Sequence, residues 1–336
     1  MSDLRNALDE LRAAALRQRE RLSKRVLLGS QLGVAIGADP DGGSSLALRV
    51  EGDNESHLGE LQDSEGLSFG WSEQDYGPGR WFEMSANDQE DAEIFAHICS
   101  DLEPQLLADD ATQAIKGIGL RIRMWQRFLA VGKAGLGPRQ QMGLWGELQV
   151  LQVLANGIGW NRALLGWVGP GGASQDFREG AWAAEVKTTS FSADSLAISS
   201  LDQLDTAIHS QIYLVHIGAA ELSPTEGQPL SDAVEKVRAK VQDQAELRAE
   251  LENRLLASGY HSMHERRYSR RGFLMRVRIV YQVRDNFPRL ERSSLPSAIK
   301  GASYNLFTKD IASFAVSAEE LPNELHSLVV EAAESE

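Results

Sequence analysis

The chain has 336 residues, of which 42% are hydrophobic and 24% are charged, and this composition is ordinary for a globular protein of one large or two average domains. No apolar run approaches the length of a membrane span, and the polar N-terminus lacks the hydrophobic segment of a signal peptide, so we expect a cytoplasmic protein without a membrane partner. The single cysteine, Cys99, excludes an internal disulfide and a cysteine-rich zinc site.

A net charge of −14 argues at first sight against DNA binding, but the charge is unevenly distributed. Residues 31–118 hold 19 acids and three bases, a net charge of −16, which leaves the rest of the chain with +2 as the difference between −14 and −16. Residues 117–146 hold five bases and no acid, and residues 261–292 hold nine arginines and three acids. These two basic stretches are therefore the candidates for DNA contact.

The N-terminal third predicts a small α+β domain. Residues 3–28 have leucine and alanine at helical spacing, which indicates a helix that packs on its own domain, with a partner helix as the alternative. Residues 30–86 contain short apolar runs between Gly and Asp residues and predict a small antiparallel sheet, and residues 88–107 predict a helix with an acidic start. The change in charge places a boundary near residue 110, between an acidic domain of residues 1–110, for protein contact or an accessory role, and a domain of residues 111–336.

Two helices are expected next, over residues 112–131 and 140–155, with a Gly-rich break between them. On the second helix an apolar stripe runs through Leu144, Leu148 and Leu151, and Glu147 lies on the inward shoulder of that stripe. A carboxylate turned toward a core needs a partner or a metal. The alternative is that Glu147 sits at the rim of the helix and reaches water.

Residues 182–190 read as a strand that follows a Gly-rich lead-in. Because side chains alternate along a strand, Glu185 and Lys187 share one face, and the other face is free to pack on a core. Asp176 offers a second carboxylate upstream, and an Asp followed by Glu-X-Lys is the pattern of the PD-(D/E)XK nucleases. The alternative is an ordinary ion pair on an exposed strand, since eight lysines and 48 acids should give roughly one acid-X-Lys by chance.

The remaining elements are predicted from periodicity and from apolar runs. We expect strands over 195–200, 212–217, 273–283 and 303–307, a long helix over 229–258, and a peripheral helix in the acidic tail from residue 317. The run 212–217 is apolar throughout and indicates a buried central strand.

Several other polar groups were weighed as sites. His261 and His264 have a metal-like spacing, but no cysteine or acid at a useful position, which favours a loop pair over zinc. His216 lies inside an apolar strand and is interpreted as a satisfied core residue. The arginines of residues 266–271 form a candidate phosphate-contacting patch, with a solvated loop as the alternative: Arg266, Arg267, Arg270 and Arg271.

The order of motifs resembles a known family. The series runs Gly143-Leu-Trp-Gly-Glu147-Leu, Trp167-Val-Gly-Pro170, Asp176-Phe177, Glu185-Val-Lys187-Thr-Thr189, Ile198-Ser-Ser-Leu-Asp-Gln203-Leu and Asn286-Phe-Pro-Arg-Leu290. It is similar, over roughly residues 110–310, to a bacterial family of PD-(D/E)XK-motif proteins associated with restriction-modification and phage-defence genes. One departure is that Gln175 stands where the motif has proline.

The resemblance implies a restriction-endonuclease-like fold, in which a mixed sheet is flanked by helices and the acidic residues gather at one edge. It also implies a nuclease site in which Asp176 and Glu185 are ligands of Mg²⁺, or of Mn²⁺ as an alternative, and Glu147 extends the ligand set directly or through water. Lys187 would orient or activate water, and Gln203 would orient the scissile strand or a ligand. Phosphodiester hydrolysis needs such groups, because water must lose a proton and the phosphate must be stabilised.

Two hypotheses about function remain after these considerations. The first is a Mg²⁺-dependent DNA endonuclease that acts with other protein subunits in a restriction or anti-phage defence system, with homodimerisation left open. The second is a nuclease-like subunit of such a system that binds DNA or protein without cutting. The complete set of Asp176, Glu185 and Lys187 favours the first hypothesis.

Overall fold

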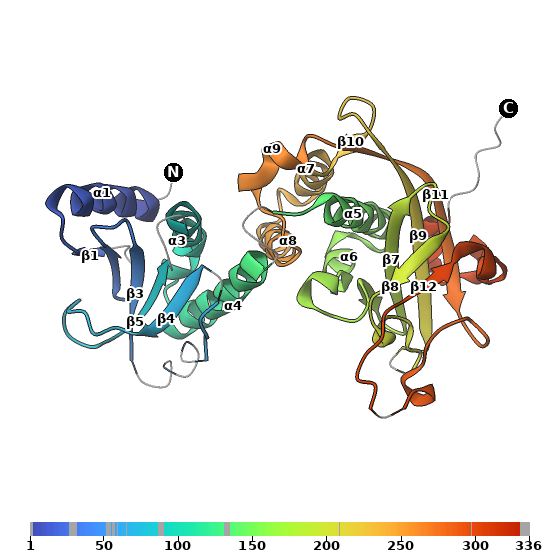
Figure 1. Cartoon of the computed structure of the whole chain (residues 1–336), viewed down its shortest axis with the longest axis horizontal. Coiled ribbons are helices and arrows are strands. Elements are labelled where there is room, and N and C mark those ends of the chain that lie inside the picture. Colours follow the sequence, from blue (N-terminus) through green and yellow to red (C-terminus); the bar gives the residue numbers. More distant parts are fainter. Residues whose placement is uncertain are drawn as a thin grey trace. The chain divides into compact units, whose positions relative to one another are not determined.

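The computed structural model describes residues 3–26, 32–51, 55, 58, 60–64, 66–86, 91–130, 135–207, 209–296 and 298–329 (Figure 1). The chain forms two compact units, Met1–Lys133 and Ala134–Glu336. Each unit contains its own five-stranded sheet. Among the described residues there is no helix with the length and apolar character that crossing a membrane requires.

The boundary between the units lies further along the chain than the boundary near residue 110 that the change in charge indicates. Helix α4 (Ala111–Ala130) packs against α3 (Ala92–Leu106) inside the first unit. Asp101 of α3 accepts hydrogen bonds from Arg121 at 2.6 Å and from the indole of Trp125 at 2.7 Å. Arg121, at the start of the basic stretch, thus pairs with an acid of the first unit. For this reason the change in charge along the sequence does not mark the boundary between the two units.

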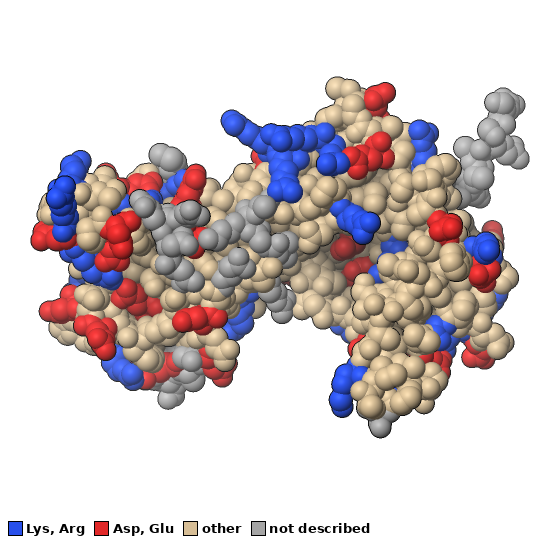
Figure 2. All heavy atoms as spheres, viewed as in Figure 1, with Lys and Arg blue, Asp and Glu red and all other residues tan. Residues whose placement is uncertain are grey.

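The sheet of the first unit is antiparallel, as predicted, and has the order β1-β2-β3-β5-β4. Its strands are β1 (Leu22–Val26), β2 (Val34–Ala38), β3 (Ser44–Val50), β4 (Leu67–Trp71) and β5 (Arg80–Ala86). Helix α1 (Asp3–Gln18) is shorter than the helix predicted over residues 3–28, because Arg19 adopts a left-handed conformation, with φ of 56°, and the chain then enters β1. Acidic side chains are spread over the visible face of this unit (Figure 2).

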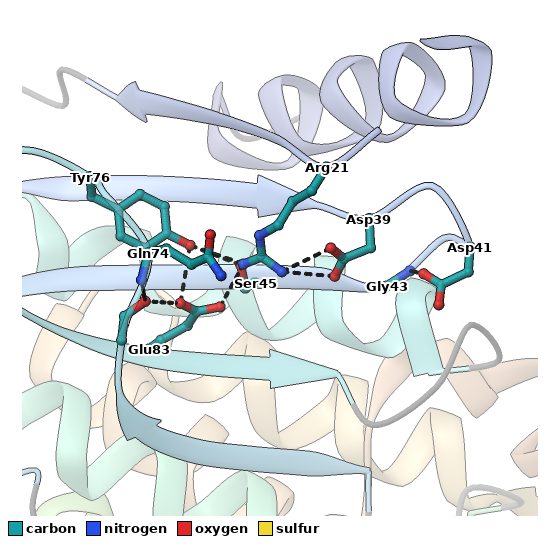
Figure 3. Close-up of polar contacts among 9 residues, drawn as sticks. Arg21, Asp39, Asp41, Gly43, Ser45, Gln74, Tyr76 and Glu83 are labelled. Atoms are coloured by element: carbon teal, nitrogen blue, oxygen red, sulfur yellow. Dashed lines mark hydrogen bonds and ion pairs between the residues drawn. The ribbon is translucent and has the colours of Figure 1, made fainter. Parts of the chain in front are cut away.

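A network centred on Arg21 ties the strands of this sheet together (Figure 3). The guanidinium of Arg21 donates to Asp39 at 2.9 Å and to Glu83 at 2.8 Å, and Tyr76 donates to the same Glu83 carboxylate at 3.1 Å. Burial by itself lowers the pKa of Arg21, but its bond to Tyr76 and the charges of Asp39 and Glu83 raise that pKa above its ordinary value. The network thus joins Arg21, which directly precedes β1, to the end of β2 and to β5 through charge-assisted hydrogen bonds.

The sheet of the second unit is mixed, which confirms the predicted fold class. Its order is β10-β11-β9-β7-β6, and only the β7–β9 pair is parallel. The strands are β6 (Phe177–Glu179), β7 (Trp182–Ser190), β9 (Gln211–Leu222), β10 (Gln228–Pro229) and β11 (Gly272–Val283). A separate two-stranded sheet pairs β8 (Ser195–Ile198) with β12 (Tyr304–Phe307).

The two faces of this sheet contact different cores. On one face a large apolar core joins Ala184 and Val186 of β7 to the helices α5 (Pro138–Ile158), α6 (Trp160–Gly166), α7 (Leu230–Val241) and α8 (Ala245–Ala257). On the other face a smaller core joins Ile212 and Leu214 of β9 to β8 and β12. Helices therefore cover one face of the mixed sheet, the β8–β12 pair packs on the other, and β7 lies next to the edge strand β6.

Two predicted helices differ from the structure. The single helix expected over 229–258 is two helices, α7 and α8, because Val241 ends one apolar stripe and Leu247 begins the next. Six residues turn a helix by about 600°, so one straight helix could not bury both residues on one side. The tail expected to be a peripheral helix from residue 317 forms short 3-10 turns, and its Leu325 and Leu328 are buried in the core against α5.

Helix α5 and strand β7 approach each other closely at one glycine. A Cβ atom added to Gly146 would lie 1.8 Å from Oγ1 and 3.0 Å from Cβ of Thr188. Rotation could move the hydroxyl away, but the Cβ of Thr188 is fixed to the backbone of β7. Gly146 therefore sets the distance between the helix that carries Glu147 and the strand that carries Glu185.

We predict that Gly146→Ala lowers the free energy of unfolding by about 1–3 kcal/mol, because the added methyl pushes α5 away from β7. Gly143→Ala is the matched control, because it lies in the same helix and its added Cβ would have no atom within 4 Å. That change should raise stability by about 0.5–1 kcal/mol through helix propensity. Chemical denaturation of both variants tests this, and equal effects would contradict the close approach.

Candidate active site

Strand β7 holds the central pair of the candidate site. Glu185 is only 2% exposed, and its Oε1 accepts hydrogen bonds from Lys187 Nζ at 2.8 Å and from Gln203 Nε2 at 2.7 Å. The two side chains lie on the same face of the strand, as the alternation predicts. The Glu185–Lys187 pair is therefore not the exposed strand ion pair that the sequence left as an alternative.

Gln203 joins this pair from a separate 3-10 turn, Leu201–Leu204, that follows β8. Its Oε1 accepts from the backbone N–H of Ser199 at 2.8 Å and from Lys187 Nζ at 3.3 Å, while its Nε2 donates to Glu185. The amide thus bonds both charged groups at once and is itself held by the backbone. Gln203 fixes the orientation of Glu185 and Lys187 relative to each other.

Asp176 lies directly before β6 and reaches β7 with its side chain. The β6–β7 ladder begins at Phe177 and Ala184, and beyond it the backbone N–H of Val186 donates to Asp176 Oδ2 at 2.7 Å. The backbone carbonyl of Asp176 accepts from Val168 and Gly169 at 2.8 and 3.0 Å. Gly169 is required here, because a Cβ at this position would lie 2.7 Å from Asp176 Oδ1.

Glu147 approaches Asp176 from helix α5. Its Oε2 accepts a hydrogen bond of 2.7 Å from the indole of Trp167. Glu147 and Asp176 line a common cavity of about 290 Å³, together with Gly143, Gly169 and others from the surrounding loops. Glu147 is half-buried and turns toward the cluster, as the position on the helix shoulder predicts.

The carboxylates of this cluster perturb one another. Burial, and then the charge of Asp176, raise the pKa of Glu147 to about 8, although the bond from Trp167 and the charge of Lys187 oppose this. Burial also raises the pKa of Asp176 to about 6, against the backbone bond from Val186 and the charge of Lys187. Burial and the charge of Asp176 raise the pKa of Glu185 well above its ordinary value. Three carboxylates share one ammonium, so the cluster favours a further cation.

The donor set meets the requirements of a magnesium ion in part. Oε2 of Glu185 is buried and has no hydrogen-bond partner among the described residues, which leaves it available to a ligand. Across the part of the chain that the structure describes, no group of three or more His, Cys, Asp or Glu side chains is arranged to hold a metal ion. Mg²⁺ does not need such a cage, because it commonly binds one or two carboxylates and completes its shell with water and phosphate oxygens. Asp176 and Glu185 fit that kind of site.

The structure thus brings together all five residues that the sequence proposes for catalysis: Glu147, Asp176, Glu185, Lys187 and Gln203. Sequence reasoning missed the hydrogen bond from Trp167 to Glu147, although Trp167 stands in the motif series. It also missed the backbone bond that holds Asp176. The sequence around Trp167 does not indicate which acceptor its indole N–H will bond.

The four candidate DNA-binding arginines lie elsewhere in the same unit. Arg266, Arg267, Arg270 and Arg271 belong to α9 (Glu265–Tyr268) and the turn that precedes β11, and they line a cavity of about 610 Å³. Figure 2 shows basic side chains gathered in the region of α9.

The candidate histidines have structural contacts. His261 accepts from the backbone of Met263 at 3.2 Å and caps a turn. His216 is buried, which lowers its pKa, and its Nε2 lies 2.9 Å from the hydroxyl of Thr189. Its Nδ1 has no hydrogen-bond partner among the described residues, so the expected core histidine is satisfied at one ring nitrogen only.

Comparison with known proteins identifies the family. A family model described as "Putative PD-(D/E)XK family member, (DUF4420)" matches residues 5–308. The chain belongs to this PD-(D/E)XK family, and the match includes the N-terminal unit as well as the site. Searches of curated proteins and of solved structures found no match.

We predict that Glu147 destabilises the metal-free protein progressively as pH rises from about 4.5 to 8. Burial raises the pKa of Glu147 to about 8 in the folded state, against an ordinary value of 4.5, so this group binds more protons in the folded state than in the unfolded state in this window. The contribution of Glu147 to the free energy of unfolding must then fall with rising pH. Glu147→Gln should flatten this fall and should be more stable than the wild type at pH 8.5 by more than about 1 kcal/mol.

Denaturation at several pH values in the presence of a chelator measures this dependence. Glu246→Gln, on an exposed position of α8, is the control and should keep the wild-type profile. If Glu147→Gln also keeps it, the carboxylate of Glu147 is ionised at neutral pH and the description of the cluster fails.

Proposed function

We propose that this member of the PD-(D/E)XK family is a metal-dependent endodeoxyribonuclease that hydrolyses phosphodiester bonds with Mg²⁺, or with Mn²⁺ in its place. The observation that carries the proposal is the cluster in which Asp176, Glu185 and Lys187 converge with Gln203 and in which Oε2 of the buried Glu185 has no partner among the described residues. A buried excess of negative charge is costly unless a cation compensates it.

Each residue would have a distinct role in this reaction. Asp176 and Glu185 would hold the metal ion, which when bound supplies Lewis-acid stabilisation of charge on the phosphate. Lys187 has three N–H donors, of which Glu185 and Gln203 use two. The third can orient the attacking water or bond a phosphate oxygen and stabilise the charge that develops there. Glu147 can extend the site directly or through water.

The substrate and the partners follow from charge. The arginines around α9 would contact DNA phosphates, because the rest of the chain carries too much negative charge to attract DNA unaided. The acidic first unit would contact other protein subunits of a bacterial restriction or anti-phage defence system. The family match includes this unit, so the proposed contact surface belongs to the part of the chain that the family shares.

We expect Glu185→Gln and Lys187→Ala each to reduce DNA cleavage at least 100-fold, while DNA binding changes less than about threefold, because these groups act on water, metal and phosphate charge. The control is Glu179→Gln, which makes the same chemical change on the neighbouring strand, where Glu179 pairs with Arg162. This variant should cleave at the wild-type rate. Cleavage of several DNA forms with Mg²⁺, with Mn²⁺ and with EDTA is the measurement.

The same experiment addresses the alternative of a nuclease-like subunit that does not cut. Wild-type protein that binds DNA but leaves every DNA form intact with both metals would support the alternative. Full-rate cleavage by Lys187→Ala would show that β7 does not carry the chemistry.

We predict that Mg²⁺ raises the melting temperature of the protein, and that the rise is larger at pH 8 than at pH 6. The reason is that metal binding requires ionised carboxylates, and those of this cluster titrate above their usual range. At a concentration of 100 times Kd the stabilisation should be about 2.7 kcal/mol. Asp176→Asn should abolish the rise. Thermal unfolding at both pH values measures it without reference to activity, and a rise that persists in Asp176→Asn would place the ion elsewhere.

A further inference from the structure

Another cavity of the second unit has a lining that shares no residue with the cavity at the carboxylate cluster. It measures about 610 Å³ and is lined by four arginines, by Gln141 of α5 and by apolar side chains that include Met263. Ligand pockets for small molecules have volumes of about 300–1,000 Å³. The cavity is therefore large enough for a nucleotide, whereas an unbroken duplex can only lie across its mouth.

The lining of this cavity carries a net positive charge. Glu221 is its acidic lining residue, and it forms an ion pair with Arg271. Within the described ranges, neither Arg266 nor Arg270 lies within ion-pair distance of a carboxylate, and both side chains are exposed to the cavity mouth. Guanidinium groups in this state favour a phosphate, which they can bind through two parallel N–H bonds.

A buried amide provides the second, independent feature. Gln141 is 1% exposed, and its Nε2 donates to the carbonyl of Leu136 at 2.8 Å, which fixes the orientation of the amide. Its Oε1 has no hydrogen-bond partner among the described residues, and Gln141 itself is one of the residues that line the cavity. Arginines alone satisfy the acceptor oxygens of a phosphate, but an acceptor that has no partner among the described residues needs a donor from the ligand. The cavity therefore suits a ligand that presents an N–H group as well as a phosphate.

The N-terminus of α5 adds to the attraction for phosphate. The helix has 21 residues and begins at Pro138, which lines the cavity. Its first-turn N–H groups and its dipole place partial positive charge at this end. The cavity thus combines a cationic mouth, apolar wall segments and one buried acceptor.

We infer that this cavity binds a nucleotide that carries a terminal phosphate, with the phosphate at Arg266 and Arg270 and an N–H of the base at Gln141 Oε1. The nucleotide could come from the 5′-phosphorylated end of a DNA strand or from the free nucleotide pool, since both present the same groups. The inference goes beyond the proposed contact of these arginines with DNA backbone phosphates. Only the strand end as the source of the nucleotide rests on the proposed nuclease function.

Binding measurements on the full chain test this inference. We would use the Glu185→Gln protein in EDTA, so that cleavage cannot interfere, and two oligonucleotides of one sequence that differ only in a 5′-phosphate or a 5′-hydroxyl. Strand-end recognition predicts at least tenfold tighter binding of the phosphorylated oligonucleotide. Recognition of free nucleotides predicts that AMP or ATP binds and displaces the oligonucleotide.

Variants connect the effect to the cavity. Arg266→Glu with Arg270→Glu should abolish the preference, and Gln141→Met should weaken binding of the phosphorylated ligand at least fivefold. The matched control is Arg248→Glu with Arg276→Glu, which makes the same change in charge at exposed positions outside the cavity lining and should keep the preference.

Equal binding of both oligonucleotides, with no binding of AMP or ATP, would overturn the inference and leave the arginines as backbone contacts. That result is distinguishable from failure of the nuclease proposal, because cleavage by the wild-type protein with Mg²⁺ is measured separately.

Discussion

The hydrogen bond from Val186 N–H to Asp176 Oδ2 is the contact on which the site depends. The ladder pairs Phe177 with Ala184, so one more step in the same register would set Asp176 directly opposite Glu185. Like charges opposite each other destabilise a sheet. The chain instead leaves the ladder, because Val168 and Gly169 take the Asp176 carbonyl, and the Asp176 side chain replaces the missing backbone acceptor. The two carboxylates are therefore held close together without forming a strand pair.

In this arrangement the carboxylates of Asp176 and Glu185 repel each other where little water can screen them. Lys187 offsets part of this repulsion and Gln203 shields part of it, but both bond the same oxygen of Glu185 and leave the other oxygen without a partner among the described residues. A protein selected only for stability would replace such a cluster with apolar residues at little loss. The raised pKa values of Glu147 and Asp176 come first from burial, to which the charge of Asp176 adds at Glu147, and the charge of Lys187 offsets them only in part.

Sequence periodicity predicted the parts of this site that local geometry decides. Strand alternation placed Glu185 and Lys187 on one face, and helical spacing turned Glu147 inward, because both patterns depend only on a few neighbouring residues. Periodicity could not predict the hydrogen bonds of these residues, since Trp167 and Gln203 reach the cluster through loops whose course depends on the whole fold. Gln203 was expected at the site only from the family resemblance. The break between α7 and α8 follows from the apolar stripe, yet it contains no proline or glycine to mark it. The strand at Leu22–Val26 was missed for a similar reason: a non-glycine residue, Arg19, takes the left-handed conformation that ends α1.

Helix α5 connects the two halves of the proposed chemistry. Gln141 faces the arginine-lined cavity and Glu147 faces the carboxylate cluster, and six residues separate them, or about 9 Å along the helix axis. The helix cannot stretch, and Gly146 packs it against β7, so the spacing between cavity and cluster is fixed by covalent structure and by one close contact. If a DNA strand were held by its phosphorylated end in the cavity, the phosphodiester bond that reaches Lys187 would lie at the same distance from that end in every complex. Selection of a bond at a set distance from a phosphorylated strand end would follow from the rigidity of one helix, with Gln141 in contact only with the end base.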